Sequence, residues 1–191
     1  MKNCLHVVWM MMCLLLVSSC KDDENNLEEA EREAYRAEQD IAFQAKANEP
    51  DVYKRWVSPA GDGGYVFAKL LKEGNGKQIY YNTRLQAYYK GYLTDGTVFD
   101  QRLIEDGAPK KFAVSATYAN YNSTYNPTGY SDPIAGWTIA LQYMKEGDKY
   151  EVWIPQSLAY GSLETDDIPA YSTLIFEIEI VSVDEQAVSA N

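Results

Sequence analysis

With 191 residues, the chain has room for one folded domain plus an N-terminal extension, and its length does not favour a second full core. Hydrophobic residues at 46% and aromatic residues at 13% are too abundant for a disordered chain. The net charge of −11 leaves no basic surface of the kind that a nucleic-acid backbone requires, so we expect no nucleic-acid partner.

Residues 1–19 have the pattern of a secretion signal. Lys2 precedes an apolar stretch, residues 5–17, that is about half as long as the roughly 20 residues needed to span a bilayer. Its end, Leu16-Val17-Ser18-Ser19-Cys20, resembles a bacterial lipobox with Cys20 as the lipidated residue. The sequence therefore predicts an outer membrane lipoprotein that a lipid on Cys20 holds to the membrane.

Residues 20–26 are predicted to form an acidic tether that no core can bury. The tether also resembles the tag that sends some Gram-negative lipoproteins to the outer surface, so both the periplasmic face and the cell surface stay open.

Residues 27–60 are predicted to form a helical arm and linker. No Gly or Pro interrupts residues 27–47, and apolar residues recur there at helical spacings: Leu27, Ala30, Ala34, Ala37, Ile41 and Ala45. A stalk or an arm packed on its own domain is favoured over a dimerisation helix, because an alanine-rich stripe buries little area. Dimerisation stays open, and so does the oligomeric state.

The positions of cysteine and histidine limit the chemistry. Cys4, Cys13 and the single histidine, His6, all lie in the predicted signal. Beyond it, the chain cannot build a Ser-His-Asp or Cys-His nucleophile, an ordinary zinc site or a disulfide. We therefore expect no metal and no cofactor, and catalysis that relies on carboxylates, tyrosines, backbone groups or shape.

Residues 61–184 are predicted to form the folded domain, and residues 185–191 a C-terminal tail. Five runs have strand character: Tyr65–Leu71, Leu85–Leu93, Lys111–Val114, Tyr150–Ile154 and Thr173–Val183. Thr94-Asp95-Gly96-Thr97 is typical of a hairpin turn. One short helix fits residues 133–144, with Asp132 as its N-cap and Pro133 as its first residue. We predict an α+β fold, an antiparallel sheet of about five strands wrapped around one short helix.

Four motifs then follow in the order that is typical of one family. They are Tyr89–Asp100 (YKGYLTDGTVFD), Ile134–Trp137 followed by Ala140-Leu141 and Met144, Ile154-Pro155 with Leu158–Gly161, and Ile168-Pro169 with Ser172–Phe176. Over about residues 62–183 the chain thus resembles the FKBP-type peptidyl-prolyl isomerases. The resemblance implies a peptidyl-prolyl cis-trans isomerase that assists the folding of exported proteins and acts on proline-containing polypeptides.

The resemblance also implies a site. Its catalytic residues would be Tyr89, Phe99, Asp100, Ile134, Trp137, Tyr160 and Phe176, with Phe112, Pro133 and Ile168 binding substrate. Trp137 would form the floor of an aromatic cleft, Tyr160 and Asp100 would supply polar atoms at its edge, and the backbone N–H of Ile134 would meet a substrate carbonyl. Since adjacent residues of a strand face opposite ways, the match selects Tyr89 over Tyr88.

One segment departs from the family pattern. The connection 116–130 is longer than usual and rich in Tyr, Asn, Ser and Gly, a composition typical of binding loops. Three roles of this loop stay open: it extends substrate recognition, it covers the cleft, or it is an inert surface loop. The sequence does not distinguish between them. The alternative function is a non-catalytic FKBP-like binding module, for peptides or glycans, displayed on the outer membrane.

Overall fold

A computed structural model describes residues 19–115 and 129–186 of the chain. Residues 1–18 of the predicted signal 1–19, most of the Tyr-rich connection and the last residues, 187–191, lie outside the described residues. The chain forms two compact units, residues 1–38 and 39–191. Within the described ranges, no helix combines the length and the hydropathy that crossing a membrane demands.

The first unit contains most of helix α2 (Ser19–Gln44). The helix begins eight residues earlier than the predicted start at residue 27, so the predicted tether is helical. No Gly or Pro interrupts residues 21–26, so the sequence is compatible with a helix there.

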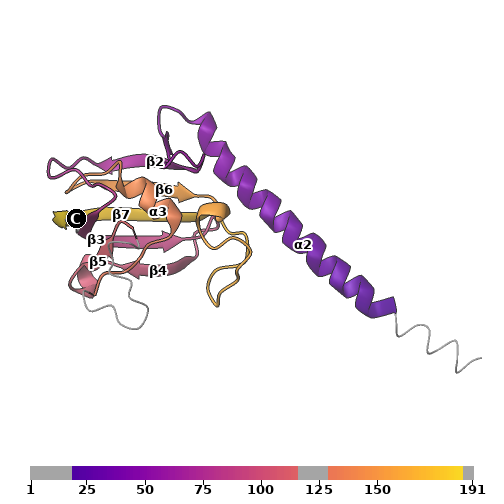
Figure 1. The fold of residues 1–191 in the computed structure, drawn as a ribbon. Helices are drawn as coiled ribbons and strands as arrows, with labels where there is room; N and C mark the ends of the chain where they lie inside the picture. Colours follow the sequence, from indigo (N-terminus) through magenta and orange to yellow (C-terminus); the bar gives the residue numbers. More distant parts are fainter. Residues whose placement is uncertain (1–18, 116–128, 187–191) are drawn as a thin grey trace, which may run out of the picture. The chain divides into compact units, whose positions relative to one another are not determined.

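The second unit is built on one antiparallel sheet (Figure 1). Its strands are β1 (Lys54–Val57), β2 (Tyr65–Lys72), β3 (Thr83–Tyr92), β4 (Val98–Arg102), β5 (Lys110–Ala113), β6 (Lys149–Ile154) and β7 (Leu174–Gln186). They lie in the order β1-β2-β6-β7-β3-β4, and β5 also pairs with β3. The described residues also include the 3₁₀ turns η1 (Ala45–Asn48), η2 (Ile104–Asp106) and η4 (Gln156–Leu158). The predicted α+β class is confirmed.

The sheet has seven strands where about five were predicted. The two strands that were missed, β1 and β4, are the edges of the sheet. In β1 only Trp56 is buried, and no residue of β4 is buried. Edge strands carry charged side chains and bury little, so neither run shows a strand's hydrophobic alternation. The predicted hairpin turn between β3 and β4 is confirmed, with Gly96 at φ 89° and the Leu93 N–H donating to Thr97 O at 2.9 Å.

Strand β3 organises the domain, because it pairs with β7 along one side and with β5 and then β4 along the other. Its residues alternate between buried and half-buried. Tyr89 is on the buried side and Tyr88 on the other, where its hydroxyl donates to Gly107 O at 2.9 Å. The choice of Tyr89 is consistent with this register.

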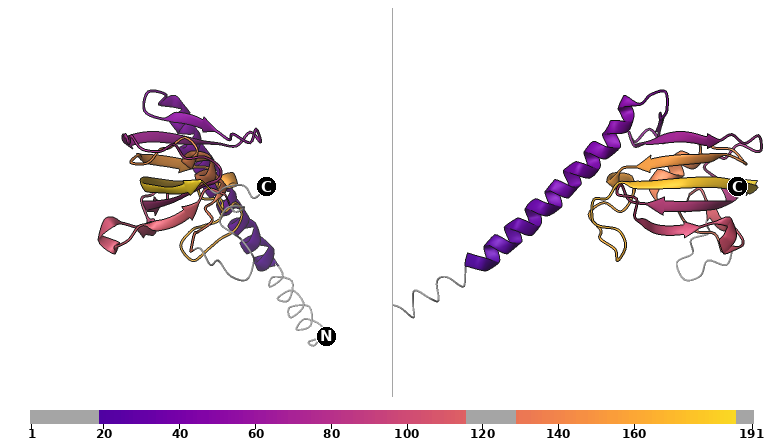
Figure 2. Two further views of the ribbon diagram at one scale, coloured as in Figure 1. Left: turned by 60° about the vertical axis from the view of Figure 1, so that its left-hand side comes forward. Right: turned by 180° about the vertical axis from the view of Figure 1, so that it is seen from behind.

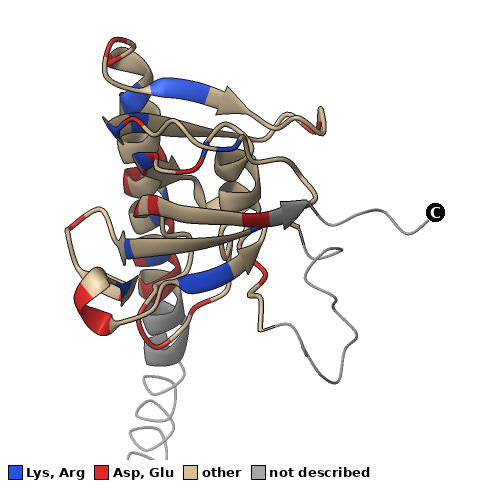
Figure 3. Cartoon of the chain, turned by 90° about the vertical axis from the view of Figure 1, so that its left-hand side faces the viewer, with Lys and Arg blue, Asp and Glu red and all other residues tan. Residues whose placement is uncertain are grey.

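Helix α3 (Ala135–Leu141) covers the inner face of the sheet. It lies in front of the strands in Figure 1 and behind them when the molecule is turned round in Figure 2. Trp137, Ile139 and Leu141 of α3 are buried in one apolar cluster with side chains of β2, β3, β6 and β7. The outer face of the sheet carries ion pairs such as Lys149–Glu177 at 2.8 Å. Figure 3 shows both signs of charge scattered over the strands.

The end of helix α2 belongs to the second unit, which begins at Gln39. Phe43 packs against Phe67 and Tyr65, with ring centroids 5.0 and 5.5 Å apart. Ile41, which the predicted apolar stripe contains, is 71% exposed, so a different face of the helix packs here. The predicted boundary at residue 61 lies inside this compact unit.

Candidate active site

A cavity of about 120 Å³ opens beside the start of α3. Eight of the ten residues that were predicted for the site line it: Tyr89, Asp100, Phe112, Pro133, Ile134, Trp137, Tyr160 and Phe176. Lys110, Ser131 and Asp132 also line it and were not predicted as site residues. Lys110 begins strand β5, and alternation with Phe112 along that strand is the sequence signal that would have revealed it.

Two predicted residues do not line the cavity. The Phe99 ring lies behind Phe176, with centroids 5.4 Å apart and planes at 88°. Ile168 is buried in the core cluster, and its N–H donates to the Thr165 hydroxyl at 3.1 Å. Phe99 thus supports one wall residue, Phe176, and Ile168 belongs to the core.

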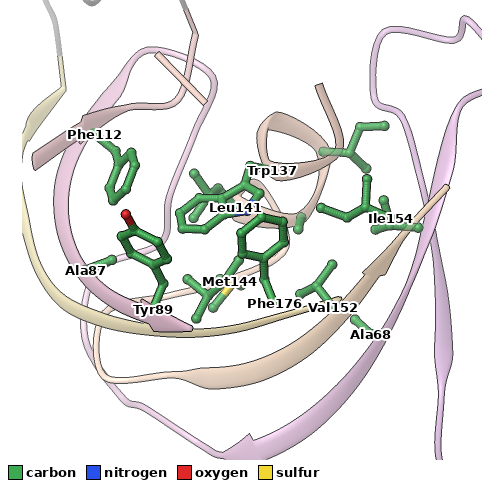
Figure 4. Packing of buried hydrophobic residues seen from close by; sticks show 14 of the residues in the cluster. Ala68, Ala87, Tyr89, Phe112, Trp137, Leu141, Met144, Val152, Ile154 and Phe176 are labelled. Carbon is green, nitrogen blue, oxygen red and sulfur yellow. The ribbon is translucent and has the colours of Figure 1, made fainter. Parts of the chain in front are cut away.

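Four aromatic rings converge on the cavity from four separate elements (Figure 4). The Trp137 ring lies 5.5 Å from Tyr89, 5.3 Å from Phe176 and 4.8 Å from Phe112, measured between centroids. Tyr89 and Phe176 both meet it edge to face, an arrangement that aromatic rings prefer. All four side chains are buried, so the cavity has an apolar floor.

Two glycines make room for these rings. A Cβ on Gly91 of β3 would lie 2.7 Å from both Phe99 and Phe176. A Cβ on Gly136 of α3 would overlap Ile154 of β6, so glycine lets the helix approach the sheet and seats Trp137. Close packing leaves no space for even one methyl group at either position.

A chain of hydrogen bonds runs along one rim of the cavity. The Tyr89 hydroxyl donates to Asp100 Oδ2 at 2.7 Å, and Lys110 Nζ donates to the Tyr89 hydroxyl oxygen at 3.4 Å. Burial of Tyr89, together with its hydrogen bond to the Asp100 carboxylate, raises its pKa above the ordinary value. The hydroxyl therefore stays protonated and acts as a donor that holds Asp100.

The opposite rim is the entry to α3. The predicted N-cap is wrong, because the N-cap is Ile134 (φ −60°, ψ 157°) and the helix begins at Ala135. Pro133 disfavours a helical conformation of Asp132, and Ile134 is still extended, so the chain turns into the helix only afterwards. The Ile134 carbonyl accepts from the Trp137 N–H at 2.9 Å.

Two polar groups on the cavity wall are free to bind a ligand. Within the described part of the chain, neither the Ile134 N–H nor the Tyr160 hydroxyl has a hydrogen-bond partner. Tyr160 is 41% exposed, and its loop is fixed by a bond from the Tyr171 N–H to Gly161 O at 2.7 Å. Burial also raises the pKa of Asp132 on the same rim.

Another cavity, of about 220 Å³, lies on the outer side of the sheet around Tyr88, Leu103 and Glu177. Its Lys149 and Glu177 already form an ion pair, and of the predicted site residues only Tyr89 borders it. Among residues 19–115 and 129–186, no three metal-ligating side chains come together.

The chain matches the family model described as "FKBP-type peptidyl-prolyl cis-trans isomerase" over residues 76–181. It is 32% identical to the macrophage infectivity potentiator of Trypanosoma cruzi over 182 residues, which cover 94% of this chain and 81% of that protein. It is also 32% identical to the outer membrane protein MIP of Legionella longbeachae over 156 residues, covering 81% of this chain and 57% of that one.

Among solved structures, a peptidyl-prolyl cis-trans isomerase from Pseudomonas syringae resembles 77% of this chain and 96% of its own, with a TM-score of 0.54 and 28% identity. The chain spans 63% and 40% of the length of two other FKBP-type isomerases that it matches.

Proposed function

Since the chain belongs to the FKBP-type peptidyl-prolyl cis-trans isomerases, we propose that its aromatic cavity isomerises X–Pro bonds in exported polypeptides. The cavity desolvates and orients the amide, without covalent catalysis. The observation that supports this proposal is the convergence of four buried rings beside two polar groups, the Ile134 N–H and the Tyr160 hydroxyl, that have no hydrogen-bond partner among the described residues. Tyr89, Phe112, Trp137 and Phe176 form the apolar part.

The chemistry matches such a site. The barrier to rotation about a peptide bond is about 18–20 kcal/mol, because twisting destroys amide resonance. No bond needs to be made to a nucleophile. The planar amide is more polar than the twisted one and is better solvated by water, so a dry cavity disfavours the ground state more than the transition state. Each 1.36 kcal/mol of this difference gives a tenfold faster reaction.

The polar groups have separate roles in this proposal. The prolyl ring packs on Trp137, and the Ile134 N–H and the Tyr160 hydroxyl donate to carbonyl oxygens of the substrate. Asp100, which Tyr89 holds at 2.7 Å, sets the polarity of the rim and transfers no proton. Phe99 positions the wall residue Phe176.

The experiment is a protease-coupled assay of prolyl tetrapeptides with the purified protein and two variants. Tyr160→Phe is expected to lower kcat/KM about twofold to tenfold, since a neutral hydrogen bond contributes about 0.5–1.5 kcal/mol. Tyr80→Phe is the matched control, because Tyr80 is also an exposed tyrosine, at 52% against 41% for Tyr160, and does not line the cavity. Isomerisation no faster than the uncatalysed rate would refute the proposed function, and equal effects of the two variants would refute the role of Tyr160.

We further propose that the protein is an outer membrane lipoprotein, attached through Cys20 after removal of residues 1–19. The lipobox-like end of the signal supports this, and a relative named for the outer membrane is compatible with it. Several acyl chains on one cysteine give stable anchoring. Labelling of cells with a radioactive fatty acid should mark the protein, and Cys20→Ala should release it to the soluble fraction. An unlabelled protein would exclude the anchor, and protease treatment of intact cells distinguishes the surface from the periplasmic face.

A further inference from the structure

Lys110 is a cation on the wall of the apolar cavity. It begins β5, pairs with Ala87 of β3, and lies on the same side of the strand as Phe112. Its Nζ lies 5.5 Å from the centroid of the Tyr89 ring and 5.6 Å from that of Phe112. The ammonium therefore lies beside two of the rings that line the cavity.

Its neighbour Lys111 points the other way, because successive side chains of a strand face opposite sides. Lys111 Nζ lies 5.6 Å from the ring of Tyr130 and does not line the cavity. The chain thus offers two adjacent lysines on one strand, of which one reaches the cavity.

The charge of Lys110 is not neutralised by an ion pair. Four lysines form ion pairs among the described residues, and Lys110 is not one of them. Of the two carboxylates on the cavity wall, Asp100 accepts a hydrogen bond from the Tyr89 hydroxyl, and neither Asp100 nor Asp132 forms an ion pair among the described residues. Arg102, paired with Tyr89 across β3 and β4, does not line the cavity, and its Nε donates to Ala108 O at 2.8 Å. Lys110 is thus a lysine without an ion pair among the described residues, on a cavity wall that also carries the carboxylates of Asp100 and Asp132.

We propose that Lys110 makes the enzyme favour X–Pro bonds that have an acidic side chain next to the proline. The inference rests on the proposed function, in which the aromatic cavity holds the prolyl ring. With the ring on Trp137, a carboxylate on the adjoining residue reaches the ammonium that stands over Tyr89 and Phe112. Lys110 is exposed, so the pair is screened by water and its effect is modest.

The experiment compares kcat/KM for neutrally blocked peptides with Glu, Gln or Lys on either side of proline. For the natural protein at low salt, the ratio of Glu to Gln peptides is expected to be about two to five at one of the two positions, as for an exposed ion pair. High salt should reduce the ratio toward one. Lys110→Gln should abolish the preference, Lys110→Arg should keep it, and Lys110→Glu should reverse it in favour of Lys peptides.

The control is Lys111→Glu, which makes the same change of net charge on the opposite side of β5 and should leave the ratio unchanged. A ratio of one for the natural protein at both positions, or an equal shift by Lys111→Glu, would overturn the proposal. The affinities of the same peptides, measured by NMR titration, should show the same ratios. Absent turnover would refute the proposed function, whereas equal affinities would refute only the role of Lys110.

Discussion

Gln39 joins the end of helix α2 to the residues that precede β4 and β7, and its replacement should lower the free energy of unfolding by a predictable amount. The side chain is only 1% exposed. Its Nε2 donates to the Thr94 hydroxyl at 3.0 Å, in the turn before β4, and its Oε1 accepts from the Thr173 N–H at 3.1 Å, just before β7. Strands β4 and β7 carry Phe99 and Phe176, so one amide connects the supports of the cavity wall.

Gln39→Ala leaves the N–H of Thr173, a fully buried residue, without its acceptor. An unsatisfied buried group costs about 1–3 kcal/mol, and the lost methylene adds about 0.8 kcal/mol. We therefore expect a loss of about 2–4 kcal/mol in the free energy of unfolding. With a urea slope of about 2 kcal/mol per molar, the midpoint should fall by about 1–2 M.

Urea unfolding followed by tryptophan fluorescence measures this effect. Gln44→Ala is the matched control, because Gln44 is exposed on the same helix and donates to the Tyr65 hydroxyl at 2.9 Å. It should cost less than about 1 kcal/mol. Gln39→Met fills the space without the hydrogen bonds and should fall between the two. If Gln39→Ala destabilised the protein no more than Gln44→Ala, the structural role of the helix end would be rejected.

Two further predictions concern the cavity wall. Gly91→Ala would push the Phe99 and Phe176 rings apart, so it should lower the free energy of unfolding by about 1–3 kcal/mol and also lower kcat/KM. Gly64→Ala is the control and should destabilise the protein less, because its nearest contacts are side chains at 3.2 Å. Equal losses of stability in the two variants would contradict the close packing at Gly91. Because burial raises the pKa of Asp132, this group stabilises the fold below its unfolded pKa and loses that contribution as pH rises through its folded pKa. The Asp132→Asn variant should therefore be more stable than the natural protein near neutral pH and equally stable near pH ~3. Thermal unfolding measured across this pH range tests the prediction. A variant that is more stable only at acid pH would contradict a raised pKa of Asp132.

Buried strands were predictable because their side chains alternate. In β7, Leu174, Phe176, Ile178 and Ile180 are buried while Glu177 and Glu179 lie on the other face, as the period of two indicated. The edge strands β1 and β4 escaped prediction, since a strand with one neighbour and little burial leaves no periodic signal.

The residues that depend on tertiary contacts were harder to predict. Gln39 looks like a surface residue in the sequence and becomes buried only because Thr94 and Thr173, 55 and 134 residues away, supply its partners. In the same way, Phe43 packs on the sheet, although it is not part of the apolar stripe that was predicted within residues 27–45. Lys110 reaches the cavity only through the pairing of β5 with β3.

The measurement that tests the account most directly is a crystal structure of the protein with a bound prolyl peptide. We predict that the pyrrolidine ring lies on Trp137 between Tyr89, Phe112 and Phe176, with the Ile134 N–H donating to a peptide carbonyl. A peptide bound elsewhere, with this cavity still open and the Ile134 N–H unpaired, would contradict the account.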